Sequence, residues 1–406
     1  MAELQLRSLT AEDRDAVSYL DELAFGFTRD PGDLPVPHLD VMTNEYALGV
    51  FDQDELVGCG GAFPLDVTMP GGASLPCPGV TMIAVKPTHR RRGALSTMMR
   101  ELLDRCRANG HPIAALTASE AAIYGRYGFG RATSFKRISV DAKRARFVAS
   151  APEIGDVRML PVDEARAMWP ELHERCRPNV SGMMRRSDDL WAGDLRDQPS
   201  DRGGASAMHH VAHRDETGRI DGAVAYRITM DWRGDGAFHE ISVKHFSAET
   251  PAVEIALWRF LLSVDLVGTV VADRPVHEAL REALAEPRII KTIHDGDHNW
   301  LRILDPAACF AARSYLFDGE FVVGFEDPMY DDVSGSYLLQ VGDGVATVER
   351  TDAPADLTAS AQSWASIVAG DVDARALAAT GRAAGDAARA SIFFAVTDTP
   401  YSDVHY

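Results

Sequence analysis

The sequence predicts an α/β fold that occurs twice and is followed by an α+β domain. Three observations predict it. The chain has 406 residues, more than one hydrophobic core usually supports, so two or three domains are expected. Strand and helix patterns alternate over residues 1–150 and partly recur over residues 151–290, which indicates two α/β units. Residues 291–406 instead place several strands before Ala-rich helices, the order typical of an α+β domain.

The first unit is expected to open with a strand, a helix and two further strands. These elements lie at residues 4–9, 11–25, 46–51 and 56–62, and a strand at 113–118 and a short helix at 120–127 close the unit. Polar residues 52–55 predict a hairpin turn, and three prolines predict a loop after the first helix: Pro31, Pro35 and Pro37. Gly58, Gly60 and Gly61 lack the G-x-G-x-x-G spacing, so we expect a bulged strand and no dinucleotide-binding loop.

The most informative stretch joins an apolar strand to a helix through an arginine-rich turn. Residues 80–85 are typical of a buried strand, and apolar residues at helical spacing predict a helix over residues 94–106. A helix that begins at Gly93 presents unpaired N–H groups and a positive dipole end to an anion, and glycine permits close approach. Arginines add charge-assisted donors. The turn therefore predicts a pyrophosphate cradle formed by Arg90, Arg91, Arg92, Gly93, Ala94, Leu95 and Ser96.

This turn resembles the acetyl-CoA loop of the GCN5-related N-acetyltransferases (GNAT). Residues 90–94 match the family pattern Arg/Gln-x-x-Gly-x-Gly/Ala except at its last position, where Leu95 replaces a small residue. Together with residues 118–128, Ala-Ser-Glu-Ala-Ala-Ile-Tyr-Gly-Arg-Tyr-Gly, the turn is similar to that of the enhanced intracellular survival (Eis) acetyltransferases. The resemblance implies an acetyl-CoA-dependent N-acetyltransferase that passes the acetyl group directly to a primary amine. It also implies a homohexamer.

The resemblance assigns coenzyme contacts to residues on both sides of the turn. In the GNAT fold the strand before the turn splays from its neighbour, which leaves the amide of Val85 free for the thioester carbonyl. Ile83 and Ala84 then line the pantetheine arm. Ser119 and Glu120 complete the coenzyme contacts at the end of the following strand.

The resemblance also implies a proton donor and a proton acceptor. Tyr124 matches the family's general acid, and a phenol with a reference pKa of about 10 is protonated at neutral pH. Tyr127 is the alternative donor, and a core tyrosine with a satisfied hydroxyl is the structural alternative for either residue. The implied acceptor is the α-carboxylate of Tyr406, which would reach back into the first domain from a tail that follows Pro400. The alternative is a frayed chain end without a role.

The amine acceptor is expected to bind where aromatic and acidic residues precede the proline loop. Phe25, Phe27 and Asp30 could offer aromatic walls and a carboxylate for an ammonium group, although aromatic residues at a helix end are also common in cores. A net charge of −19 favours cationic acceptors such as polyamines, aminoglycoside-like molecules or lysine-containing peptides. His405 stands where some Eis members carry an acidic residue, which weakens the expectation for aminoglycosides.

The middle unit reads as a diverged copy of the first. Residues 241–244, Ile-Ser-Val-Lys, can be laid over residues 83–86, Ile-Ala-Val-Lys. In that register residues 248–251 replace the arginine-rich turn and put Glu249 where phosphate-binding groups would stand, so this copy is not expected to bind coenzyme. The resemblance implies the same arrangement, with two GNAT domains of which the first is active.

The last domain is predicted from several strands followed by helices. The strands are expected at residues 301–304, 321–325, 337–341 and 346–349, Ala-rich helices between 357 and 389, and a final strand at 391–396. Residues 300–305, Trp-Leu-Arg-Ile-Leu-Asp, and this order of elements resemble the sterol-carrier-like domain that ends Eis chains. A lipid or sterol carrier with a coenzyme-A-sensing first domain is therefore the alternative function.

Composition excludes several other classes of protein. The negative charge disfavours nucleic acid and anionic membranes, and a spanning segment and a secretory signal are both missing, so a cytoplasmic enzyme is expected. Five scattered cysteines without a C-x-x-C pair are expected to be reduced core residues. The histidines at 209, 210, 213, 294 and 298 lie in polar sequence without cysteine partners, so we expect solvated loops and no metal site.

Overall fold

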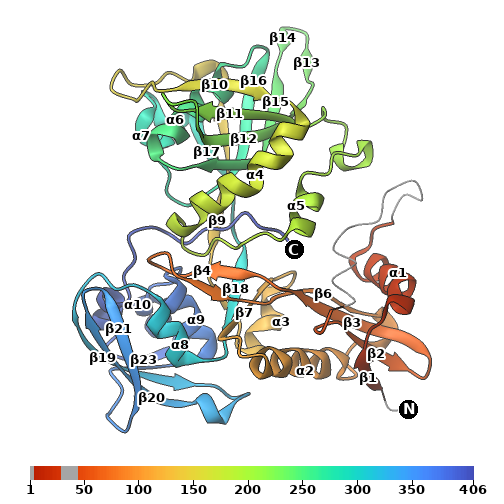
Figure 1. Ribbon diagram of the computed structural model, residues 1–406, viewed down its shortest axis with the longest axis vertical. Coiled ribbons are helices and arrows are strands. Elements are labelled where there is room, and N and C mark those ends of the chain that lie inside the picture. The colour runs from red at the N-terminus through yellow and green to blue at the C-terminus, as the bar shows by residue number, and fades with distance from the viewer. Residues whose placement is uncertain (1–3, 29–43) are drawn as a thin grey trace.

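The computed structural model describes residues 4–28 and 44–406, and its strands form two large mixed sheets and one smaller sheet (Figure 1). In Figure 1 the second large sheet lies above the other two, and the chain end lies between it and the first sheet. Both large sheets carry helices at their faces. This is the repeated α/β architecture with an added α+β domain that the sequence predicts.

The first sheet has the order β1-β2-β3-β6-β7-β18-β8. Its strands are β1 (Gln5–Ser8), β2 (Leu48–Asp52), β3 (Glu55–Phe63), β6 (Gly79–Val85), β7 (Ile113–Thr117), β18 (Asn299–Ile303) and β8 (Gly130–Arg131). The flanking elements are α1 (Arg14–Phe25), α2 (Ala94–Ala108), α3 (Ala121–Tyr124), the 3-10 helices η1 (Ala11–Asp13), η3 (Pro87–His89) and η4 (Gly125–Tyr127), and a hairpin of β4 (Asp66–Thr68) and β5 (Ser74–Pro76).

The second sheet has the order β10-β11-β12-β15-β16-β9-β17. Its strands are β10 (Asp156–Leu160), β11 (His209–Arg214), β12 (Ile220–Thr229), β15 (His239–Ala248), β16 (Val267–Arg274), β9 (Ser134–Asp141) and β17 (Ile290–Asp297). Its helices are α4 (Val162–Cys176), α5 (Asp188–Asp194), α6 (Pro251–Ser263) and α7 (Leu280–Ala283). The parallel pair β15–β16 joined by α6 repeats the parallel pair β6–β7 joined by α2, which confirms the predicted internal duplication.

The third sheet has the order β21-β20-β19-β22-β23. Its strands are β21 (Val345–Thr351), β20 (Gly335–Gly342), β19 (Gly319–Glu326), β22 (Leu357–Ser360) and β23 (Ala383–Gly385), and its helices are α8 (Pro306–Ala312), α9 (Ala361–Ala369), α10 (Ala374–Ala379) and α11 (Ala387–Phe393). Helix α9 also packs against β18 and β8, so the third domain covers the far edge of the first sheet.

Three strands lie in sheets other than those the sequence assigned, and one of them is β17, which starts one residue before the predicted third domain but is the edge strand of the second sheet. Strand β9 falls within residues 1–150 but is hydrogen-bonded between β16 and β17 of the second sheet. Strand β18 falls within residues 291–406 but lies between β7 and β8 of the first sheet. Every residue of β18 is buried, so its apolar pattern indicates a central strand without indicating the sheet to which it belongs.

The final strand expected at residues 391–396 is wrong, because residues 391–393 are the last residues of helix α11 and residues 394–396 follow its end without forming a strand. The side chain of Asp386 accepts a hydrogen bond from the amide of Arg389 at 2.9 Å and caps the helix. Ala390, Phe393 and Phe394 are buried at the three- and four-residue spacing of a helix face. The predicted bulged strand and the reduced cysteines are confirmed, since β3 changes register at Cys59 and all five cysteines are buried and unpaired.

Candidate active site

Strands β6 and β7 separate beside the predicted coenzyme turn. Among the described residues their ladder joins Gly79 to Ala115 and Val80 to Leu116 and ends there, although β6 continues to Val85. Met82 has φ 53°, and the β3–β6 register shifts beside it, which is a bulge of the kind common at active sites. The amide of Lys86 donates to Val57 on β3 at 2.8 Å. Because amides alternate in direction along a strand, that of Val85 faces the separated edge.

Helix α2 begins at this opening with its first amides unpaired inside the helix. Gly93 caps the helix with φ 90° and no side-chain hydrogen bond, and a Cβ atom placed there would meet nothing within 4 Å. The first intrahelical bond runs from the amide of Thr97 to the carbonyl of Gly93 at 3.0 Å. The preceding amides therefore point toward open space, which is the arrangement that binds phosphate groups.

A cleft of about 690 Å³ lies over this helix mouth. It brings together most of the predicted coenzyme residues, namely Ile83, Ala84, Val85, Arg90, Arg91, Gly93, Ala94, Leu95, Ser96, Ser119 and Glu120. Arg92 does not line it, because its guanidinium group bonds to Asp52 at 3.2 Å. His89 lines the cleft and contacts the same carboxylate at 3.2 Å, so Asp52 holds both ends of the turn against β2.

Both candidate proton donors line the cleft and are buried. The exposed fraction of Tyr124 is 6% and that of Tyr127 is 5%. Burial raises the pKa of Tyr124, while the side chain of Ser119 has the opposite effect. The hydroxyl groups of Tyr127 and Ser96 lie 3.0 Å apart and share a hydrogen bond. The hydroxyl of Tyr127 is thus hydrogen-bonded to the first turn of α2, whereas Tyr124 is a protonated phenol beside Ser119.

The last residue of the chain is packed against the first sheet. The ring of Tyr406 meets Phe63 edge-on with centroids 6.4 Å apart, and its hydroxyl donates to Asn299 at 3.4 Å. A Cβ atom at Gly79 would lie 2.7 Å from this ring. Burial raises the pKa of the Tyr406 phenol, which Thr117 at the end of β7 opposes. The chain end therefore lies at the strands that separate beside the cleft.

The predicted acceptor residues lie in different places. Phe25 lines the cleft with 52% of its side chain exposed, and Phe27 is exposed outside the cleft lining. Asp30 lies outside the described residues. The ring of His405 packs against His298, with ring nitrogens 3.1 Å apart. Sequence reasoning missed four further lining residues, which adjoin the predicted motifs and could have been found from them: Ala24, His89, Ile123 and Arg126.

The corresponding helix mouth in the second domain is closed by its own side chains. The hydroxyl of Thr250 caps α6 by accepting from the amide of Val253 at 3.3 Å. Glu249 is paired with Arg175 and Arg219, each at 2.7 Å. These contacts support the expectation that this copy does not hold a pyrophosphate, because Pro251 has no N–H group, the amide of Val253 is already bonded and a carboxylate stands in the turn.

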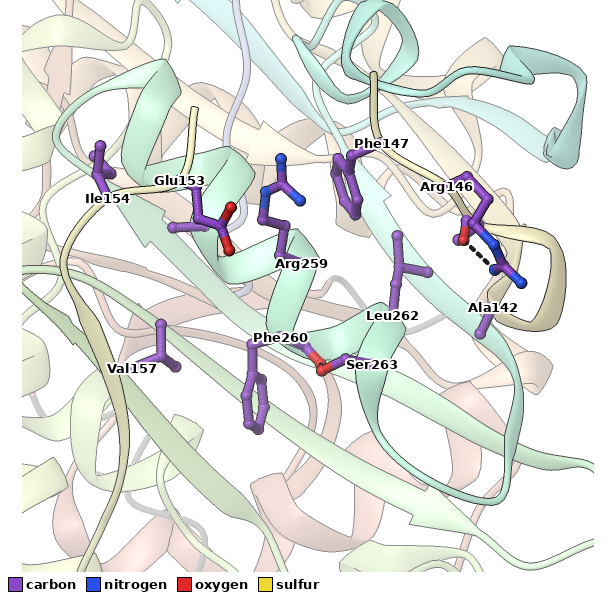
Figure 2. Close-up of a pocket in the computed structure, with 12 residues that line it drawn as sticks. Ala142, Arg146, Phe147, Glu153, Ile154, Val157, Arg259, Phe260, Leu262 and Ser263 are labelled. Atoms are coloured by element: carbon purple, nitrogen blue, oxygen red, sulfur yellow. Dashed lines mark hydrogen bonds between the residues drawn. The ribbon is translucent and has the colours of Figure 1, made fainter. Parts of the chain in front are cut away.

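A second cavity, of about 550 Å³, lies between α6 and the segment 142–157 (Figure 2). Figure 2 shows Arg259 of α6 extending between Glu153 and Phe147. The guanidinium group of Arg259 donates to the carbonyls of Pro152 at 3.1 Å and Ala151 at 3.0 Å and lies 4.3 Å from the ring centre of Phe147. The lining includes Ser263 at the far end of α6, so this cavity is not the counterpart of the coenzyme cleft.

The described residues contain no cluster of three or more His, Cys, Asp or Glu side chains placed to hold a metal ion. The histidines that we expected in solvated loops are largely buried instead, because His210 and His213 fill polar positions on β11 and His298 is buried in the link between β17 and β18. His213 bonds to Asp221 at 2.5 Å and His210 accepts a hydrogen bond from Trp169 at 3.2 Å. No helix in the described part of the chain is long and apolar enough to cross a membrane.

Comparisons with known proteins agree with this geometry. Family models match an acetyltransferase (GNAT) domain at residues 5–132, a second acetyltransferase (GNAT) domain at residues 182–303 and a sterol carrier protein domain at residues 306–402. The fold and the cleft therefore define a tandem GNAT acetyltransferase with a sterol-carrier-like third domain.

Individual relatives show to which family of tandem GNAT acetyltransferases the chain belongs. The N-acetyltransferase Eis of Mycobacterium tuberculosis is 34% identical over 333 residues, which cover 81% of this chain and 79% of that protein. An uncharacterized N-acetyltransferase of Streptomyces coelicolor is 35% identical over 390 residues, which cover 93% and 94%. The crystal structure of Eis1 from Mycobacterium abscessus has a TM-score of 0.86 at 25% identity and covers 99% of this chain and 100% of its own. The chain belongs to the Eis family of N-acetyltransferases, as its two sequence motifs predict.

Proposed function

We propose that the first domain transfers an acetyl group from acetyl-CoA to a primary amine, with Tyr124 as proton donor and the α-carboxylate of Tyr406 as proton acceptor. One observation carries the proposal. The separated strands, the open mouth of α2 and Tyr124 line a single cleft, and the chain end packs beside it.

The residues of the cleft suit each part of acetyl-CoA. Amides of Ala94, Leu95 and Ser96, with the exposed Arg90 and Arg91, would hold the pyrophosphate. The separated edge of β6 would hold the pantetheine arm by its free backbone groups. When bound, the coenzyme supplies an acetyl group activated as a thioester.

The chemistry required of the protein is then a set of proton and charge transfers. The amide of Val85 donates a hydrogen bond to the carbonyl oxygen as negative charge develops there. The Tyr124 hydroxyl donates its proton to the departing sulfur, and its raised pKa keeps it protonated at neutral pH. The terminal carboxylate has a reference pKa of about 3.5 and is ionised, so it can attract an ammonium group and accept a proton as the nitrogen attacks.

We propose a small cationic amine as the acceptor: a polyamine, an aminoglycoside-like molecule or a lysine-containing peptide. The net charge of −19 and the exposed ring of Phe25 at the cleft support this proposal. The homohexamer implied by the family resemblance and the cytoplasmic location expected from the sequence stay predictions.

The carrier alternative is not favoured, because aromatic side chains fill the interior of the third domain. The rings of Phe310, Phe321, Trp364 and Phe394 pack against one another with centroids 5.3 to 6.1 Å apart. The indole of Trp364 also donates to the carbonyl of Gly324 at 2.8 Å.

The proposal is tested by mixing the protein with acetyl-CoA and a panel of amines and following the release of free thiol. Tyr124→Phe should lower kcat about a hundredfold or more and leave the Kd of acetyl-CoA near the wild-type value, since it removes a proton donor alone. Tyr127→Phe is the matched control and should retain most activity. Turnover by none of the amines would reject the proposed function, and a larger loss in Tyr127→Phe would exchange the two roles.

A further inference from the structure

The second domain has the same opening between strands as the first. Its parallel ladder runs from His239 and Val267 to Ser242 and Val271, and beyond this point, in the described residues, β15 pairs with β12 and β16 pairs with β9. In the first domain the equivalent separation leads into the coenzyme cleft. The second opening therefore has the shape of a substrate-arm groove without a phosphate-binding turn.

The C-terminal tail of the same chain occupies this second opening. The hydroxyl of Tyr401 donates to the backbone carbonyl of Asp273 on β16 at 3.1 Å, at the level where β15 has separated. Tyr401 and Ser402 are buried, and both border a small cavity with Val243 of β15. The amide of Tyr401 donates to Ser181 at 2.8 Å, so side chain and backbone are both held.

A buried arginine of the second domain holds the tail more tightly at the next residues. The side chain of Arg186 is 1% exposed and donates to both the carboxylate and the backbone carbonyl of Asp403, each at 2.9 Å. It also lies 2.8 Å from Asp194, donates to His173 at 3.0 Å and lies 4.6 Å from the ring centre of Trp191. Burial would raise the pKa of Asp403, but Arg186 and nearby histidines hold it below its usual range, so the pair is ionic.

We propose that Arg186 and Asp403 are positioning residues, through which the second domain holds the tail and sets the place of the Tyr406 carboxylate at the first domain's cleft. The inference rests on the proposed function of that carboxylate. Three residues of chain span at most about 11 Å, so a fixed Asp403 confines Tyr406 to a short arc. The ring of Tyr406, packed at Gly79, is the second anchor, and the carboxylate lies on the chain that both anchors hold.

The proposal explains why a domain without a phosphate-binding turn keeps a strand opening. The opening receives a peptide in place of a coenzyme arm, so the second domain acts on the reaction through the chain end. A loosened tail would displace the carboxylate, and a displacement of about 1 Å can cost a hundredfold in rate.

The first test is Asp403→Asn, which removes the charge and keeps the shape. We expect kcat for the best amine of the panel to fall about tenfold or more, with the Kd of acetyl-CoA within about twofold of wild type. Carboxypeptidase A should release Tyr406 about tenfold faster from this variant. The matched control is Asp197→Asn, which opens the similarly buried pair of Asp197 and Arg227 in the same domain, a pair whose further hydrogen bonds go to Arg202, Ser206 and Met208 and not to the tail. It should change neither kcat nor release.

The second test separates positioning from a general loss of structure. One glycine added after Tyr406 already displaces the terminal carboxylate. If Asp403 acts only by positioning that carboxylate, Asp403→Asn should not lower kcat further in the extended chain. If Asp403→Asn damages the structure in general, kcat should fall again. Asp403→Glu keeps the charge and should retain more activity than Asp403→Asn. The proposal would be overturned if Asp403→Asn released Tyr406 faster with an unchanged kcat, or if the release of Tyr406 were unchanged. If the wild type acetylates no amine, the proposed function fails. The rate at which carboxypeptidase A releases Tyr406 still decides whether Arg186 and Asp403 hold the tail.

Discussion

At the scale of single residues, Gly79 shows how the chain end is fitted to the first domain. A Cβ atom there would lie 2.7 Å from both Leu65 and the ring of Tyr406, closer than side chains pack. We predict that Gly79→Ala displaces the ring, destabilises the fold by about 1–3 kcal/mol and lowers kcat more than the Kd of acetyl-CoA changes. Gly342→Ala is the control, because that strand glycine has open space around it. Thermal unfolding and thiol release measure both variants, and equal kcat values would contradict the prediction.

Most of the cleft could be predicted from the sequence because its residues are contiguous. The turn and the start of α2 form one run, and Ser119, Glu120 and Tyr124 follow in a second run. The direction of Arg92 could not be predicted, since it depends on Asp52 in a hairpin 40 residues away. The pairing of Asp403 with Arg186 could not be predicted for the same reason, because the two residues are 217 positions apart in the sequence.

At the scale of elements, two glycines at the ends of α2 separate the effect of backbone strain from the effect on coenzyme binding. Gly93 has φ 90° at the start of the helix, and Gly110 has φ 74° just beyond its end. Neither position has an atom within 4 Å of a Cβ, so Gly93→Ala and Gly110→Ala should each cost about 1–2 kcal/mol of stability from strain alone. Gly93→Ala should also raise the Kd of acetyl-CoA, because its methyl group enters the anion site.

Isothermal titration with acetyl-CoA and urea unfolding of both variants measure these effects. Gly110→Ala should bind the coenzyme as the wild type does, and equal losses of affinity in the two variants would show that α2 is not the phosphate-binding helix.

The elements themselves were predicted better than their partners. Local periodicity indicated β18 as a strand, whereas no strand was predicted at the residues of β9. Pairing is a long-range property, and both strands lie in sheets that their sequence neighbours do not form. Residues 391–396 were assigned to a strand because a short apolar run fits either element, and the cap at Asp386 decides for the helix.

At the scale of the whole molecule, neutral histidines hold the tail between the domains. Burial and Arg186 lower the pKa of His173 to about 4, and burial and His405 lower that of His298 to about 3. In the unfolded chain both imidazoles bind protons below a pH of about 6.5, while in the folded protein they remain neutral. Unfolding therefore takes up protons, so the free energy of unfolding should fall by about 1.4 kcal/mol per pH unit for each histidine between about pH 6 and 4.5.

Urea unfolding over this pH range measures the slope, and His173→Gln provides the control. A glutamine cannot titrate, so the variant should lose about 1.4 kcal/mol per pH unit of the wild-type slope. A slope unchanged by His173→Gln would mean that the imidazole is not held neutral. The Nδ1 atom of His173 accepts a hydrogen bond from Arg186, and its Nε2 atom donates to Met184 at 2.8 Å. A proton added to Nδ1 would therefore oppose the same guanidinium group that holds Asp403. Acid should therefore loosen the tail as well as destabilise the fold. The stability of the molecule and the position of its last residue both depend on the buried cluster of His173, Arg186 and Asp403.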